Sequence, residues 1–262
     1  MVLDIKKEFT DIRDMYTKDA SRTSFNALLI GKFGTGKTYS LKTCRGPVLV
    51  DCFDPGGAKT IEDATKSGLA LVRYYDKEDP KNPTEYDRWE ATFERNRREG
   101  LFKEVGTYVI DSATMWVAAL SNKTAKRFAR PDNVLQIQDY NLLQMIFKNV
   151  LAACTSLPCD FILTGHIESV KDETTGRMEA AISLIPSLQK FLPLLFDEVY
   201  VTLTKETSKG VEYFFLTANT GMYQARTRLG AGGKFELYER PDFKGLLKKV
   251  GFPTEDKPFF NI

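Results

Sequence analysis

Residues 31–38 read GKFGTGKT, which fits the pattern G-x-x-x-x-G-K-[ST] with Gly31, Gly36, Lys37 and Thr38. Glycines let a backbone wrap closely around a ligand with several N–H groups pointing inward. The lysine of this pattern reaches the outer phosphates of a nucleotide, and the final hydroxyl contacts magnesium. The stretch therefore predicts a phosphate-binding loop. The residues expected to contact the nucleotide are Gly31, Lys32, Phe33, Gly34, Thr35, Gly36, Lys37, Thr38 and Tyr39.

The sequence on either side of the loop has the order that phosphate binding requires. An apolar run at residues 25–30 predicts a buried strand before the loop, and a helix is expected from Lys37 to about Cys44. The N-terminal end of that helix adds positive potential at the loop. A glycine-rich turn with no ligand is the alternative interpretation.

A second motif is TYVIDS at residues 107–112, in which Asp111 directly follows a short buried strand at 108–110. An acid in this position can lie beside the phosphate loop and hold magnesium through water. We therefore expect Thr38 and Asp111 to form the metal site. The alternative role for Asp111 is a simple helix cap.

Two more acids follow the apolar strand predicted at residues 48–50. Asp51 and Asp54 stand in the stretch DCFDPGG, and one of them is expected to orient the attacking water as a general base. We favour Asp54 over Asp51. Both are also ordinary turn-forming residues before a Pro-Gly pair.

His166 is the one histidine of the chain and follows a buried strand predicted at residues 161–164. A lone histidine usually has a structural role. This strand is expected to lie next to the strand that carries Asp111, so we assign His166 a catalytic role as a sensor that contacts the γ-phosphate.

Short apolar strands alternate with helices along the rest of the chain, which is typical of an α/β fold with a mostly parallel central sheet flanked by helices. Further helices are expected at 1–20, 84–99, 115–128, 138–156, 186–196 and 241–250. Residues 199–204 and 213–217 predict antiparallel strands near the C-terminus, and 167–182 a hairpin or mobile loop. One domain over residues 1–262 is expected, with an N-terminal helix at 1–20 and a core at 22–250.

Composition and net charge limit the binding partners, the location and the metal sites that we expect for this protein. The 262 residues carry 37 Lys plus Arg against 35 Asp plus Glu, a net charge of only +2, so a polyanion would be held by local basic clusters. No apolar run approaches the ~18 residues that span a bilayer, and the start lacks a signal peptide, so we expect a cytoplasmic protein. The four cysteines have no CxxC spacing, which favours reduced thiols over a zinc site.

Taken together, these elements resemble the RecA-like P-loop ATPases, and more closely the phage recombination ATPases of the Sak type. The resemblance covers about residues 22–250. It is carried by GKFGTGKT, YVIDSATMW at 108–116, LTGH at 163–166, FDEVYVTL at 196–203 and ARTRLG at 225–230. It implies a RecA-like core that binds ATP and Mg²⁺, and for a phage protein the host cytoplasm.

The resemblance also implies a homo-oligomer, either a ring or a filament, in which each subunit completes its neighbour's ATP site. The matching residues are Arg226 and Arg228, which are expected to act as catalytic arginine fingers. Two solvated arginines on an edge strand are the alternative.

DNA-binding loops are implied at about residues 124–134 and 167–182. The basic residues there are Lys126, Arg127 and Arg130 in the first loop, and Lys171 and Arg177 in the second. The second loop also carries the acids Glu168, Asp172, Glu173 and Glu179, which oppose DNA binding. Phe128 is a candidate for base stacking, with a core position as the alternative.

The motifs predict a magnesium-dependent ATPase, and the resemblance implies that it acts on single-stranded DNA in phage recombination or annealing. A single-strand annealing protein or a single-strand binding protein is the expected protein partner. Two alternatives stay open at this point. One is an ATP-loaded switch that recruits a recombination partner with little hydrolysis, and the other is a P-loop kinase of a small molecule.

Overall fold

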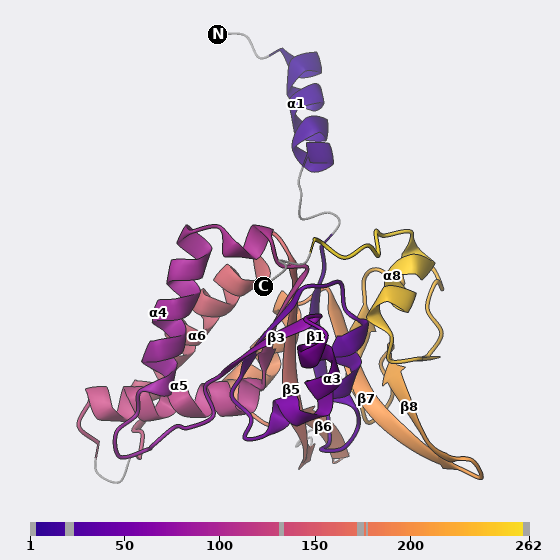
Figure 1. Cartoon of the computed structure of the whole chain (residues 1–262). Coiled ribbons are helices and arrows are strands. Elements are labelled where there is room, and N and C mark those ends of the chain that lie inside the picture. The colour runs from indigo at the N-terminus through magenta and orange to yellow at the C-terminus, as the bar shows by residue number, and fades with distance from the viewer. Residues whose placement is uncertain (1–3, 19–23, 131–133, 172–175, 177, 259–262) are drawn as a thin grey trace.

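The computed structural model describes residues 4–18, 24–130, 134–171, 176 and 178–258 (Figure 1). The strands are β1 (Asn26–Gly31), β2 (Val48–Cys52), β3 (Ala70–Tyr74), β4 (Thr107–Asp111), β5 (Asp160–Lys171), β6 (Met178–Ile182), β7 (Glu198–Thr207), β8 (Gly210–Leu216), β9 (Arg226–Thr227) and β10 (Tyr238–Glu239). The α-helices are α1 (Ile5–Lys18), α2 (Lys37–Ser40), α3 (Glu62–Lys66), α4 (Glu85–Arg98), α5 (Ala113–Arg127), α6 (Ile137–Thr155), α7 (Pro186–Phe191) and α8 (Phe243–Val250).

The strands form one central sheet in the order β10-β8-β7-β1-β5-β4-β2-β3. Strands β3, β2, β4, β5, β1 and β7 are parallel to one another, and β8 pairs antiparallel with both β7 and β10. The predicted fold class, a mostly parallel sheet flanked by helices with antiparallel strands toward the C-terminus, is confirmed.

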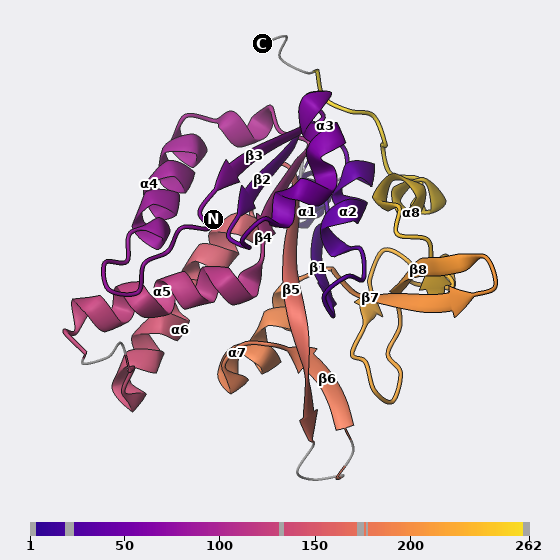
Figure 2. The ribbon, with the colours of Figure 1, turned by 60° about the horizontal axis from the view of Figure 1, so that its bottom comes forward.

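Both faces of the sheet are covered, because the side chains of a strand alternate between its two sides. In β1, Leu28 and Ile30 belong to one hydrophobic core cluster, and Ala27 and Leu29 belong to the other. Aromatic and aliphatic residues of α4, α5, α6 and α7 complete the first cluster. Residues of α3 and α8 complete the second (Figures 1 and 2).

The register of the parallel strands brings the predicted motifs to one edge of the sheet. Gly31, at the end of β1, lies opposite His166 of β5, and Cys52 of β2 lies opposite Asp111 of β4. Strand β5 lies between β1 and β4 (Figure 2). The prediction that the strand before His166 neighbours the strand that carries Asp111 is therefore confirmed.

Several elements differ in length from the prediction: the helix expected at 186–196 is α7 only to Phe191, and β7 is longer than the strand expected at 199–204. Two further differences lie near the site. Helix α2 ends at Ser40 and continues as a 3-10 helix only to Thr43, because the hydroxyls of these two residues donate to the carbonyls of Lys37 and Ser40 at 2.7 Å and so compete for helix acceptors. Strand β5 extends through His166 to Lys171, where it pairs antiparallel with β6. The described residues 167–171 and 178–182 thus form an antiparallel pair, as expected for the hairpin, one of the two forms that the sequence predicts.

Helix α1 projects away from the rest of the structure (Figure 1). Its apolar residues Ile5, Phe9, Ile12 and Met15 are each at least 53% exposed, so no described part of the chain covers them. Within the described ranges, no helix combines the length and the apolarity that crossing a membrane demands.

Candidate functional site

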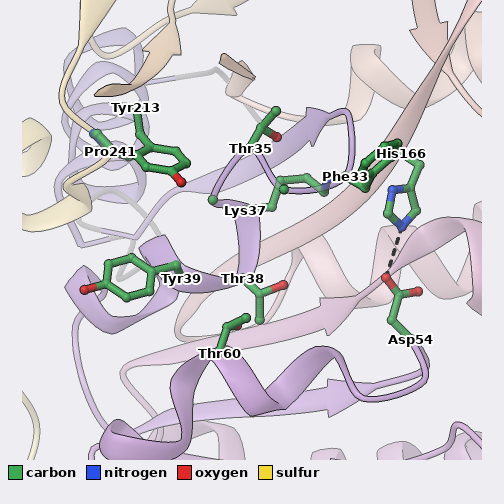
Figure 3. A pocket seen from close by; sticks show the side chains of 12 residues that line it. Phe33, Thr35, Lys37, Thr38, Tyr39, Asp54, Thr60, His166, Tyr213 and Pro241 are labelled. Atoms are coloured by element: carbon green, nitrogen blue, oxygen red, sulfur yellow. Dashed lines mark hydrogen bonds and ion pairs between the residues drawn. The ribbon is translucent and has the colours of Figure 1, made fainter. Parts of the chain in front are cut away.

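The loop at residues 31–38 connects β1 to α2 and forms one wall of a cavity of about 640 Å³ (Figure 3). The residues that line the cavity are Phe33, Gly34, Thr35, Gly36, Lys37, Thr38, Tyr39, Asp54, Thr60, His166, Tyr213 and Pro241. Of the predicted nucleotide contacts, Gly31 and Lys32 lie outside this lining. Gly31 is buried beneath the loop, and Lys32 is exposed.

The loop needs glycine for two different reasons. A Cβ atom at Gly31 would lie 1.9 Å from Oγ1 of Thr202, so β7 approaches the loop too closely for any side chain. Gly36 has a φ of +86°, a conformation that other residues rarely adopt. The side chains of Thr35 and Thr202, whose Oγ1 atoms are 2.5 Å apart, join the loop to β7.

Lys37 is buried under the loop. Its Nζ donates to the carbonyl oxygens of Gly31 at 2.9 Å and Lys32 at 2.8 Å. Burial lowers the pKa of this amine, and the nearby carboxylates of Asp111 and Asp54 oppose that shift. The ammonium group is thus held beside the backbone that encloses the cavity, where a phosphate oxygen would replace the carbonyls as its partner.

The side chains of Thr38 and Asp111 are in contact, as the predicted metal site requires. Thr38 Oγ1 donates to Asp111 Oδ2 at 2.9 Å, and Thr164 of β5 donates to Asp111 Oδ1. Burial raises the pKa of Asp111, which hydrogen bonds from the two threonines only partly offset. The cap of α5 is Ser112, and Asp111 accepts side-chain hydrogen bonds from Thr38 and from Thr164 of β5 rather than from that helix.

This pair fits magnesium by its chemistry, because a carboxylate and a hydroxyl are the hard oxygen ligands that Mg²⁺ takes alongside nucleotide phosphates. Over the described part of the chain, no group of three or more His, Cys, Asp or Glu residues converges into a self-contained metal site. A cation here would therefore take its remaining ligands from the phosphates and from water.

Asp54 faces the cavity from the loop after β2 (Figure 3). Its Oδ2 lies 3.1 Å from His166 Nε2, and its Oδ1 accepts a hydrogen bond from Ser112 Oγ at 2.6 Å. Burial alone would raise the pKa of Asp54, but the hydrogen bonds from His166 and Ser112 outweigh it and lower the pKa. The carboxylate is thus ionised and held in a fixed orientation.

Asp51 points away from the cavity, into the hydrophobic core on the other side of β2. It accepts two hydrogen bonds from Arg73, at 2.6 and 2.9 Å, and one each from Tyr108 and Trp89. With its carboxylate buried and engaged by three side chains, Asp51 has a structural role. Of the two acids left open by the sequence, Asp54 is the one in the cavity lining.

Arg226 and Arg228 lie near the N-terminal ends of the parallel strands, whereas the cavity lies at their C-terminal ends. Their strand, β9, pairs with Glu198 and Val199 at the start of β7. Arg226 Nη2 donates to two backbone carbonyls, of Pro193 and Phe196, both at 2.6 Å. Arg228 is 56% exposed and forms an ion pair with Asp197 at 2.9 Å. Within one subunit, neither guanidinium reaches the cavity.

The predicted DNA-binding residues have different surroundings. Lys126 and Arg127 are exposed at the end of α5, with Lys126 Nζ donating to Asn82 Oδ1 at 2.8 Å. Arg130 instead donates twice to the buried Asp139, at 2.7 Å each, with its guanidinium 5.5 Å from the centre of the Phe128 ring. Lys171 is exposed at the end of β5. Arg177 lies outside the described residues.

Other residues of the site carry a weak signal in the sequence or none. Thr164 and Ser112 stand within the quoted motifs, where their closeness to Asp111 and His166 gave some indication of them. Nothing marks Thr60, Tyr213 or Pro241, which enter the cavity lining only because distant segments fold together.

Comparisons with known proteins agree with a nucleotide site. A family model described as an AAA domain matches residues 23–229. Curated protein sequences yield no match to the chain.

Solved structures that resemble the chain share little sequence with it. A KaiC-like protein from the archaeon Pyrococcus horikoshii OT3 is 13% identical, with 78% of this chain and 81% of that chain covered and a TM-score of 0.39. The flagellar accessory protein FlaH from Methanocaldococcus jannaschii is 13% identical, with 82% and 83% covered and a TM-score of 0.41. An ATPase from the type III secretion system of pathogenic bacteria is 15% identical, with 68% and 51% covered and a TM-score of 0.46.

Proposed function

Because this chain belongs to the AAA domain family, we propose that it is a magnesium-dependent ATPase of RecA type, which acts on single-stranded DNA and whose ATP site a neighbouring subunit completes. The observation that carries the proposal is the meeting of four side chains at one site. Lys37 and Thr38 follow β1 and Asp54 follows β2, and all three line the cavity, while Asp111 at the end of β4 accepts a hydrogen bond from Thr38.

Each of these side chains has a distinct task in phosphoryl transfer. Lys37 and the loop amides bind the outer phosphates and stabilise the charge that develops on them. Thr38 and Asp111 would hold magnesium, which would supply positive charge beside the phosphate oxygens. Asp54 orients the attacking water and accepts its proton, while the contacts with Ser112 and His166 fix the carboxylate in place.

A neighbouring subunit supplies the last positive charge in this proposal. Arg228 is the better candidate of the two predicted arginines, because it is mostly exposed and its one ion pair is with a partly exposed Asp197. Arg226 is half-buried and already binds two carbonyl oxygens of its own chain. Its contacts support a role in holding β9 against the segment before β7.

Single-stranded DNA is the polyanion that the exposed residues Lys126, Arg127 and Lys171 would bind. Cations on exposed segments can follow a phosphate backbone without reading its sequence. We do not assign this role to Arg130, because its pair with Asp139 occupies the guanidinium.

The test is the rate of phosphate release from ATP with and without single-stranded DNA, run with a sizing measurement of the assembly. We expect DNA to stimulate turnover, and ATP to increase the size of the assembly. Lys37→Ala should lower turnover by about 100-fold or more, since it removes the charge that stabilises the transferring phosphoryl group. Tight ATP binding with negligible turnover at saturating DNA would contradict hydrolysis and indicate an ATP-loaded switch.

The proposed contact with single-stranded DNA is tested with a separate double variant. Lys126→Ala with Arg127→Ala should weaken DNA binding and reduce the salt dependence of the affinity, because two phosphate contacts are lost. Lys234→Ala with Lys248→Ala removes the same charge from exposed positions elsewhere and should leave both unchanged. Equal effects of the two pairs would show that net charge alone is responsible.

A further inference from the structure

The cavity has a second end that phosphate binding does not use. Tyr39, Tyr213 and Pro241 lie together on the side of Lys37 away from Asp54 and His166 (Figure 3). They come from α2, from β8 and from the segment after β10. Tyr39 is 61% exposed and Tyr213 is 43% exposed, so both rings present apolar surface that the described chain does not cover.

The ring of Tyr39 is held in place from one side only. Lys42 Nζ lies 4.0 Å from the ring centre, and the same amine pairs with Asp63 at 2.7 Å. This cation–π contact covers one face of the tyrosine. Among the described residues the ring has no further aromatic or cation contact, and Tyr39 lines the cavity.

Tyr213 is fixed against the phosphate-binding loop. A Cβ atom added at Gly36 would lie only 3.1 Å from Cδ1 of this tyrosine, so its ring packs directly on the loop backbone. A ligand whose phosphates occupy the loop would therefore extend its opposite end past Tyr213 and toward Tyr39. In a nucleotide, that opposite end is the base.

Among the described side chains that line this end, none carries an amide, a carboxylate or an imidazole that would select one base. Among the described lining residues, the only carboxylate is Asp54 and the only imidazole is His166, and these two contact each other at the phosphate end. Tyr39, Thr60 and Tyr213 offer hydroxyls, each of which can donate or accept. Every base has a π-face, so stacking tolerates all of them.

We propose that Tyr39 and Tyr213 hold the nucleobase by stacking alone, and that the site consequently accepts purine and pyrimidine nucleoside triphosphates with little discrimination. This inference rests on the proposed function, since it assumes that the loop binds the phosphates. It predicts that affinity follows the stacking area of the base rather than its pattern of donors and acceptors.

The experiment measures equilibrium binding of ATP, GTP, CTP, UTP and inorganic tripolyphosphate in the presence of magnesium. ATP and GTP should bind within a few-fold of each other, the pyrimidine nucleotides somewhat more weakly, and all four more tightly than tripolyphosphate. Tyr39→Ala should reduce ATP affinity by about 10-fold, the size expected for loss of one base–aromatic stack, and leave tripolyphosphate binding unchanged. Tyr39→Phe should retain the wild-type affinity.

Tyr74→Ala is the matched control, because Tyr74 is a half-exposed tyrosine on the edge strand β3, outside the cavity lining. It should leave all five affinities unchanged. A preference of 100-fold or more for ATP over GTP would overturn the inference, and so would normal ATP binding by both Tyr39→Ala and Tyr213→Ala. If wild-type protein bound neither ATP nor tripolyphosphate, the proposed function would fail first, and the base subsite with it.

Discussion

Gly31 is the residue at which the phosphate-binding loop is least tolerant of change. A Cβ atom there would lie 1.9 Å from Oγ1 of Thr202 and 2.8 Å from Oγ1 of Thr35. We therefore expect Gly31→Ala to lower the free energy of unfolding by about 1–3 kcal/mol, the usual cost of overpacking. Denaturant unfolding measures this, and ATP affinity should fall with it because the loop must move.

The double variant Gly31→Ala with Thr202→Ala separates this clash from a general intolerance of alanine. Removing Oγ1 of Thr202 relieves the shortest contact, so part of the lost stability should return. Two neighbouring substitutions that compensate in this way are non-additive. Strictly additive losses in the double variant would show that the clash with β7 is not the cause.

At the scale of elements, the start of α6 depends on one buried ion pair. Asp139 accepts hydrogen bonds from Arg130 and from the backbone N–H of Gln136, and the hydrogen bond from Arg130 is the main reason that the pKa of Asp139 is lowered. A lowered carboxyl pKa stabilises the fold at pH values above the unfolded value of about 3.9, and this stabilisation is lost as the pH falls through the folded-state value. Asp139→Asn should therefore lower the unfolding temperature at pH 7, with a smaller difference from wild type at low pH.

Thermal unfolding of both proteins over a range of pH measures that difference. Asparagine keeps an acceptor for the N–H of Gln136, so the variant tests the charge and not the cap itself. A difference in unfolding temperature that stayed constant down to the lowest pH would contradict the assignment. Because Arg130 forms this ion pair, its guanidinium is engaged within its own subunit although the residue lies in a predicted DNA-binding loop.

At the scale of the whole molecule, the proposal of shared ATP sites predicts complementation between two inactive variants. Lys37→Ala subunits cannot use their own site but retain Arg228, and Arg228→Ala subunits bind ATP but lack the arginine. Each alone should be inactive, and a mixture should regain part of the DNA-stimulated turnover. Phosphate release from the mixed subunits measures this.

Arg226→Ala is the control for that experiment. Because Arg226 binds the carbonyl oxygens of Pro193 and Phe196, its loss should lower the unfolding temperature of the variant whatever the assembly. Mixing it with Lys37→Ala should not correct that loss of stability. Normal hydrolysis by Arg228→Ala on its own would exclude the shared site.

Much of the fold was predictable because it depends on local patterns. Short apolar runs bounded by polar residues identify the buried strands, and the helices at 84–99, 115–128 and 138–156 match α4, α5 and α6 to within about two residues at each end. The short α2 was not foreseen, because its hydroxyl-to-carbonyl contacts depend on side-chain orientation.

The local pattern alone identifies the loop at 31–38, because glycine, lysine and hydroxyl residues at this spacing have few other uses. It also identifies Asp111, which directly follows the short apolar strand predicted at 108–110. The packing of the elements decides which of Asp51 and Asp54 faces the cavity. Asp51 lies within β2 and points into the same core as Leu49, whereas Asp54 lies in the loop after that strand, where no alternation sets its direction. The packing also decides that Arg130 is engaged by Asp139 and that Tyr39 and Tyr213 line the same cavity. These contacts join residues that are far apart in the chain or depend on the direction of a side chain. They form only when the helices and loops pack on the sheet.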